Sequence, residues 1–262
     1  MLPMPAGPAL LVVGHPGHEL RVHGWLSEAR PLVLVLTDGS GHGGTPRLSS
    51  TTALIEGVGA TAGPVFGRFS DALMYQALLK RHTSVFVDLA VELSEVIVRN
   101  RIAVVVGDDA EGYNPTHDVC RMLIDAAVEM AQPSLDTRVA NLAFALMDRP
   151  DRSLAADTGR SSQIELGDPA LERKIAAALN YAELADEVRH ARSTWGDDAF
   201  RLETFRHVAP GELWAPMDAP PFYEDYGSGR VRAGAYSEVI RYDQHIRPLA
   251  DALVARALRR AS

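Results

Sequence analysis

Short runs of continuously apolar residues alternate along the chain with segments in which apolar residues recur every three or four positions. Three such runs, at 9–14, 31–36 and 102–106, are the clearest. Bounded by glycine, proline or polar residues, they are typical of buried strands. Helices are expected in the segments with helical spacing: 18–30, 49–58, 71–80, 84–99 and 117–131. Strands that are apolar on both faces belong to a sheet covered on both sides, so the pattern predicts an α/β fold with a mostly parallel sheet.

The rest of the chain carries weaker signals. Three more elements are expected: a short strand at 64–66, a strand at 138–147 and a helix at 169–191. From about residue 210 to 234, proline, glycine and aromatic residues predict an irregular cover over the sheet edge. A closing helix over 235–260 would be interrupted near Pro248. Because no linker or shift in composition divides the chain, residues 1–262 are interpreted as a single domain.

The composition narrows the class of protein. Apolar residues make up 47% of the chain and charged residues 23%, which is ordinary for a globular protein. A formal net charge of −8 argues against nucleic-acid binding, because phosphate contacts need a basic surface. No apolar run approaches the roughly 18 residues of a membrane span. We therefore expect a small-molecule partner, with no nucleic acid and no membrane; a homo-oligomer is left open.

The single cysteine and the N-terminus bear on the compartment. Cys120 has no partner for an internal disulfide, which suits a reducing environment. The first residues lack the basic start and the apolar length of a signal peptide. A cytoplasmic location is the expectation.

Polar loops follow the three clearest strands. These loops read HPGHE at 15–19, TDGS at 37–40 and DDAEGYNPTHD at 108–118. In an open parallel sheet the carboxyl ends of the strands share one edge, and ligands bind beyond that edge. The three loops are therefore expected to meet and to form the functional site.

Histidines in two of these loops suggest a metal site. His15 and His18 are three residues apart at the start of a helix, and His117 would supply a third, distant ligand. Three protein ligands with a fourth position left to water are typical of catalytic zinc, which lowers the pKa of that water to about 7. Zn²⁺ is the expected metal, although imidazoles also suit other divalent transition metals. In the alternative, His15 caps a helix or is hydrogen-bonded in a turn, and His18 is solvated.

At these residues the chain resembles the PIG-L/LmbE-like (GlcNAc-PI de-N-acetylase-like) family of zinc-dependent N-deacetylases. The matching stretches are VVGHPGHE at 12–19, LTDGSG at 36–41 and EGYNPTHD at 111–118, and the similarity covers about the first 130 residues. The resemblance implies a Rossmann-like three-layer sandwich. It also implies a metal held by His15, His18 and His117, and hydrolysis of an amide.

The departures from the family pattern concern proton transfer. The family's usual general base is an Asp, and its position is Gly17 here; the leading His of the second motif is replaced by Asn114. Asn114 could still donate a hydrogen bond to an oxyanion. A substitute base must reach the attacking water. The candidates, in order of preference, are Asp38, Glu111, Glu19 and Asp118.

Two residues lie at positions that resemble those of the family's substrate-binding residues. Arg68 and Asp71 follow the short strand expected at 64–66 and should face the same edge of the sheet. Arg68 could bind a carboxylate or phosphate bidentately, while in the alternative it is a surface residue and Asp71 caps a helix. Arg47, after the glycine-rich loop, is a further candidate for the same kind of binding.

Three functions are consistent with these residues. The first is a metal-dependent hydrolase, an N-deacetylase or amidase, that removes an acyl group from an amino sugar or small conjugate. The second is a metal-binding relative with altered or no deacetylase activity, because Gly17 occupies the usual base position. The third is a metal-free nucleotide or sugar binder. Metal content separates the third from the others, and turnover separates the first from the second.

Overall fold

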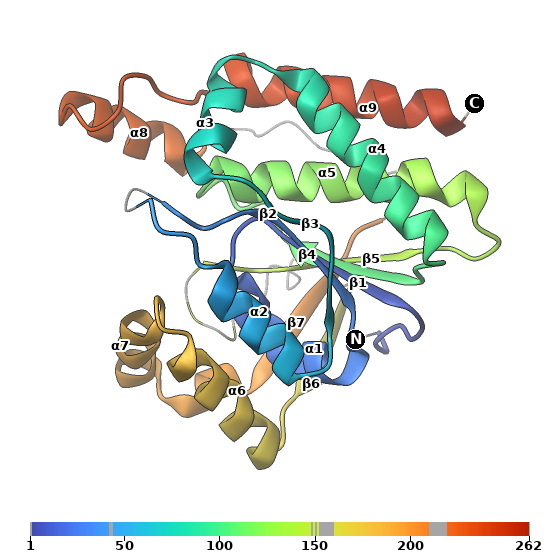
Figure 1. Ribbon diagram of the computed structural model, residues 1–262, viewed down its shortest axis with the longest axis vertical. Coiled ribbons are helices and arrows are strands. Elements are labelled where there is room, and N and C mark those ends of the chain that lie inside the picture. The colour runs from blue at the N-terminus through green and yellow to red at the C-terminus, as the bar shows by residue number, and fades with distance from the viewer. Residues whose placement is uncertain are drawn as a thin grey trace.

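A seven-stranded sheet runs through the middle of the described structure (Figure 1). The computed structural model describes residues 2–41, 44–147, 149, 151, 160–209 and 219–261. The sheet order is β3-β2-β1-β4-β5-β7-β6; the first five strands in this order are parallel, and β7 and β6 each run antiparallel to the preceding neighbour. The strands are β1 Ala9–Val13, β2 Leu32–Thr37, β3 Thr61–Phe69, β4 Val104–Asp108, β5 Ala140–Phe144, β6 Ser161–Glu165 and β7 Leu202–His207.

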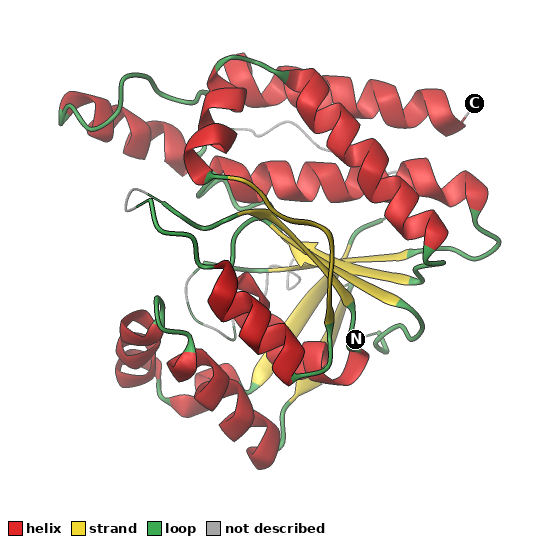
Figure 2. Cartoon of the chain, viewed as in Figure 1, coloured by secondary structure: helices red, strands yellow, loops and turns green. Residues whose placement is uncertain are grey.

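Helices cover both faces of this sheet, as Figure 2 shows. Helices α4, α5 and α9 cover one face, and α1, α2 and α6 lie on the other. The helices are α1 His23–Ala29, α2 Leu48–Gly57, α3 Asp71–Leu79, α4 Thr83–Arg99, α5 Pro115–Ala131, α6 Asp168–Asn180, α7 Ala185–Trp195, α8 Phe222–Arg232 and α9 Arg247–Ala261. The predicted Rossmann-like three-layer sandwich with a mostly parallel sheet is confirmed. None of the described helices is both long and apolar enough to cross a membrane.

The apolar runs of the sequence are explained by burial on both faces. Leu10 and Val12 of β1 pack into the core under α4, α5 and α9, whereas Leu11 and Val13 pack with α1 and α2. Successive side chains of a strand point to opposite faces, so a strand between two helical layers has no polar face.

Three elements differ from the sequence-based expectation. Strands β6 (SSQIE) and β7 (LETFRH) were not predicted, because these antiparallel strands at the sheet edge are partly exposed and carry no apolar run. The helix expected at 169–191 is two helices, α6 and α7, separated by a turn at 181–184.

The C-terminal region is more regular than expected over 222–232 and less regular over 235–241. Residues 222–232 form α8, while 210–218 lie outside the described residues. The closing helix expected over 235–260 begins later, because residues 235–241 are irregular; a π-helical turn over Tyr242–Ile246 leads into α9, and this change of helix type lies next to Pro248. A residue without an N–H is accommodated where the helical hydrogen-bond pattern changes from π to α.

Candidate functional site

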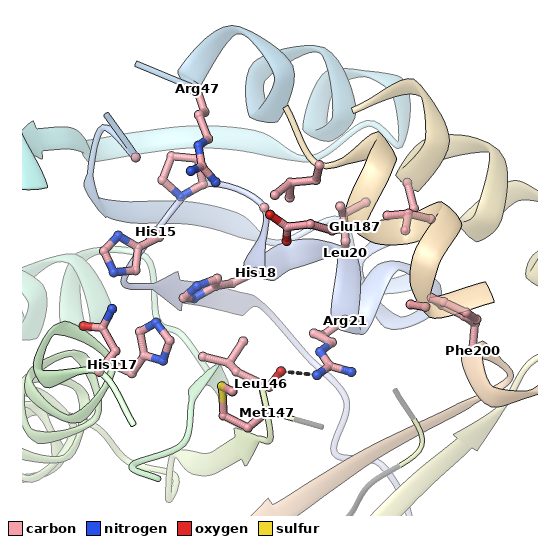
Figure 3. A pocket seen from close by; sticks show the side chains of 18 of the residues that line it. His15, His18, Leu20, Arg21, Arg47, His117, Leu146, Met147, Glu187 and Phe200 are labelled. Carbon is pink, nitrogen blue, oxygen red and sulfur yellow. Dashed lines mark hydrogen bonds between the residues drawn. The ribbon is translucent and has the colours of Figure 1, made fainter. Parts of the chain in front are cut away.

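Three histidine side chains meet at the carboxyl edge of the sheet. His15 and His18 lie in the turn after β1, and His117 lies in the first turn of α5. Because β1 and β4 pair in parallel, with Val12 opposite Gly107, the segments that follow them leave the sheet at one edge. The ring centroids of His15 lie 5.3 Å from those of His18 and His117, and the centroids of His18 and His117 are 4.7 Å apart (Figure 3).

The start of α5 places His117. Asn114 is the N-cap, its side-chain oxygen accepting a hydrogen bond of 2.8 Å from the N–H of Thr116, and Pro115 is the first helical residue. Both are favoured at these positions, since the cap satisfies a free N–H and proline needs none. His117 follows on the buried side, with 7% of its surface exposed.

Polar groups orient the other two rings. The Nδ1 atom of His18 lies 2.8 Å from a carboxylate oxygen of Asp108, the buried last residue of β4. The Nδ1 atom of His15 lies 2.8 Å from the hydroxyl of Thr37 and 3.1 Å from a carboxylate oxygen of Asp71. Partners of this kind select the tautomer of a metal-binding histidine and leave the Nε2 atom for the metal.

The electrostatics favour neutral imidazole at the centre of the cluster. Burial, followed by the charges of His18 and His15, holds the pKa of His117 well below its usual value. Burial alone would raise the pKa of Asp71, but the hydrogen bond and charge of His15 outweigh it and lower that pKa, so Asp71 is a carboxylate. Neutral imidazole is the form that binds a metal.

The spacing and chemistry of this cluster fit a metal ion. Two imidazoles that bind one tetrahedral zinc through nitrogens about 2 Å away have ring centroids about 5 Å apart. The Nε2 atom of His15 and the Nδ1 atom of His117 are buried without a hydrogen-bond partner. Among the described residues the side chains as they stand form no group of three or more metal-binding His, Cys, Asp or Glu residues. Binding would therefore require the rings to move so that their nitrogens converge.

Gly17, between the two histidines of the first turn, has no room for a side chain. Its φ of +104° is in the region that favours glycine. A Cβ atom added here would lie 2.4 Å from the Cδ1 atom of Leu184, which precedes α7. An apolar side chain from a distant part of the chain thus occupies the space beside the histidine turn.

A cavity of about 450 Å³ extends from the histidines toward α6 and α7. All three histidines line it, and Figure 3 shows them together on one side, with Phe200 on the far side. We call this cavity the apolar lobe, after the aliphatic and aromatic side chains that line it on the side of α6 and α7: Ala178, Leu184, Val188, Ala191, Trp195 and Phe200.

A second cavity of about 710 Å³ opens on the other side of His15. His15, Asp71 and Asn114 line both cavities, so the two meet at these residues. The rings of Tyr113 and Phe222 stack at its rim, with centroids 5.1 Å apart and planes 5° from parallel. We call it the aromatic lobe, after the aromatic residues that line it: Tyr75, Tyr113, Phe222, Tyr223, Tyr226 and Tyr236.

The carboxylates that the sequence suggested as bases lie outside both lobes. Burial raises the pKa of Glu19 to about 7, against the hydrogen bonds from Thr51 and the N–H of Gly17, and both of its oxygens are engaged by these groups. Glu111 accepts hydrogen bonds from two main-chain N–H groups, at 146 and 147. Asp38 accepts one from the N–H of Ser40.

Asp118, the last of the suggested bases, is also buried outside the lobes. One of its oxygens accepts hydrogen bonds of 3.1 Å from the N–H groups of Glu111 and Gly112. Burial raises its pKa to about 7, although these hydrogen bonds lower it. Asp118 therefore holds the loop before α5.

The two residues suggested for substrate binding are placed differently. Asp71 lines both lobes and contacts His15. Arg68 forms an ion pair with Glu92 and is absent from the described linings of both lobes. Arg47 does line the apolar lobe.

Sequence reasoning missed the contribution of α6 and α7. Glu187 lines the apolar lobe one turn beyond Leu184, yet no motif marks either residue. It also missed Asp108, although the first acidic residue after the apolar run of β4 was a usable signal for a group that orients a histidine.

Several solved structures share this fold. A deacetylase of the teicoplanin biosynthesis pathway aligns over 77% of this chain and 97% of its own, with a TM-score of 0.54 and 15% identity. The A40926 pseudoaglycone deacetylase Dbv21 aligns over 78% and 99%, with a TM-score of 0.52 and 18% identity. The conserved protein TT1542 from Thermus thermophilus aligns over 80% and 98%, with a TM-score of 0.50 and 20% identity. No family model and no curated protein sequence matches the chain. At such identities the likeness shows a common fold.

Proposed function

We propose that this protein is a metal-dependent hydrolase that removes an acyl group from an amine, and that it is a divergent relative of the PIG-L/LmbE-like deacetylases. The observation that carries the proposal is the cluster of His15, His18 and His117, whose rings lie 4.7–5.3 Å apart where two cavities meet. The amine half, an amino sugar or small conjugate, would occupy the aromatic lobe.

The three histidines would hold the metal, for which zinc is the first choice. When bound, zinc supplies a Lewis acid that polarises the amide carbonyl and lowers the pKa of water. Asp108 and the pair Thr37 and Asp71 would hold the rings of His18 and His15 in place through Nδ1.

Two further side chains have the chemistry that the reaction needs. The side-chain oxygen of Asn114 is engaged by Thr116, so its amide nitrogen is the atom that can donate to the developing oxyanion. Glu187 is exposed and lines the apolar lobe near Leu184, which contacts the turn at Gly17. We assign Glu187 as the base that accepts the proton of the attacking water and passes it to the leaving amine.

A second candidate function is a metal-binding relative without hydrolase activity. The observation in its favour is the contact between Leu184 and Gly17, because an apolar side chain fills the space beside the histidine turn. This function predicts the same metal site and no turnover.

Metal content tests the site. Elemental analysis of the purified protein should find about one equivalent of metal, and the variant His15→Ala/His18→Ala should lose it. The matched control is His82→Ala/His190→Ala, which removes two exposed histidines. No metal after zinc addition and dialysis, or equal metal in both variants, would remove both metal-dependent functions.

Turnover then distinguishes the two functions. Release of free amine from N-acylated amino sugars and small N-acyl amines should be seen with the metal-loaded protein and lost with the double variant. A metal-loaded protein that releases no amine from this panel supports the second function.

A further inference from the structure

The apolar lobe is larger than an acetyl group requires. We propose that it binds an unbranched acyl chain of about eight carbons, so that the substrate class is an amine carrying a medium-chain fatty acyl group. This inference rests on the proposed function, because it assigns the acyl half of the substrate.

The volume of the lobe leaves room for a chain of this size. At liquid density a non-hydrogen atom occupies about 30 Å³, the share of one water molecule. An acetyl group would fill about 90 Å³ of the lobe's 450 Å³, and an octanoyl group about 270 Å³. With an acetyl group most of the lobe would hold water against aliphatic walls, which is unfavourable.

The walls suit a hydrocarbon chain along the length of the lobe. Leu184 packs against Gly17, the residue next to His18, so an apolar wall begins beside the candidate metal centre. Val188 and Ala191 continue it on α7, at helical spacings of three and four residues. Phe200 lies across the pocket from His117 in Figure 3. A chain bound by its carbonyl at the histidines would therefore run along α7.

Protein groups hold the basic side chains that reach the lobe. The ammonium of Lys174 lies 2.8 Å from a carboxylate oxygen of Glu203 and 2.8 Å from the carbonyl oxygen of Arg21. The guanidinium of Arg21 donates to the carbonyl of Leu146. Arg47 lies toward the histidines, away from Phe200 (Figure 3). The far part of the lobe thus favours an uncharged chain over an acidic one.

Binding to metal-free protein tests this inference without turnover. The probes are N-acetylglucosamine and N-octanoylglucosamine, measured by isothermal titration calorimetry on protein dialysed against a chelator. Each buried methylene tightens binding about fourfold. We expect N-octanoylglucosamine to bind at least about thirtyfold more tightly, since six added methylenes are partly buried.

Variants locate the binding site. Ala191→Trp fills the lobe. The ratio of the affinity for N-octanoylglucosamine to that for N-acetylglucosamine, here called the octanoyl advantage, should fall to less than about threefold. Ala182→Trp makes the same change at an exposed position outside both lobes and should keep the advantage. If Ala191→Trp does not fold, judged by circular dichroism, Val188→Gln replaces it and should also reduce the advantage, by placing an amide in the lobe.

Two results would overturn the inference: equal affinity for the two compounds, or an octanoyl advantage that the folded lobe variant leaves unchanged. Either can occur in a protein that binds zinc and releases acetate. Conversely, a protein without metal or turnover can still show the advantage, so failure of this inference and failure of the proposed function are distinguishable.

Discussion

The two lobes of the cleft meet at the same residues but are built from different parts of the chain and from different chemistry. Both include His15, Asp71 and Asn114. The walls of the apolar lobe come from α6, α7 and the residues after them, whereas the aromatic lobe is formed by α3, the loop before α5, α8 and the segment after it.

The difference shows how one cleft can sort the two halves of a substrate. Aliphatic walls stabilise any chain that leaves water, without preference for its orientation. Aromatic walls offer ring faces for stacking, and tyrosine adds a hydroxyl that hydrogen-bonds at the ring edge. In the proposed function, the apolar lobe would bind the acyl group and the aromatic lobe a ring on the amine.

Removal of the metal should have the largest effect. It should reduce turnover of acetyl and octanoyl substrates equally, so that the two lobes no longer differ in their effect on the rate. A chelator should lower turnover of acetyl and octanoyl substrates alike by at least about 10³-fold, because the Lewis acid contributes several kcal/mol to the transition state. Addition of zinc should restore both rates, measured as amine release. A loss confined to one acyl length would contradict a shared centre at the junction of the lobes.

Glu187→Gln should slow the chemical step. Loss of a general base lowers kcat by about 10²–10⁴-fold, and KM should change little because the side chain keeps its shape. The control is Glu183→Gln, an exposed residue that accepts a hydrogen bond of 2.7 Å from Ser50. Equal kcat values for the two variants would move the base to another residue.

Gly17→Asp tests whether Leu184 excludes a side chain from the turn between His15 and His18. A non-glycine residue at a φ of +104°, with its Cβ atom overlapping Leu184, should reduce the free energy of unfolding by about 2–4 kcal/mol. In a Leu184→Ala background the same change should cost at least about 1 kcal/mol less, since the overlap is gone. Denaturant unfolding of the four proteins measures this coupling; additive costs would rule out the contact.

Phe222→Ala should have the smallest effect, confined to the aromatic lobe. Loss of the ring stacked on Tyr113 should weaken binding of a ring-bearing amine by about 0.5–1.5 kcal/mol, or about two- to twelvefold in Kd. Leu258→Ala, another exposed apolar residue, is the control. The octanoyl-to-acetyl ratio should stay unchanged; a shift in that ratio would mean that the two lobes do not act separately.

The parallel part of the fold was predictable because its signal is local and strong. The apolar runs of β1 and β4 are buried on both faces, and a single glycine separates each of them from the polar residue that follows. Strand β7 was missed because it is partly exposed at the antiparallel edge and alternates weakly. The closing helix begins later than expected, and its change from π to α geometry lies next to Pro248.

The sequence alone predicted that His15, His18 and His117 lie close together. Parallel strands bring the residues that follow them to one edge of the sheet, whatever packs around it. It could not place Glu187 on α7 or Leu184 in the turn before α7, which reach the cleft from a part of the sequence far from the histidines. Nor could it show that Arg68 pairs with Glu92 outside the lobes. The packing of the helices on the sheet sets these positions through many individually weak contacts. No short sequence motif predicts the combined result of these contacts.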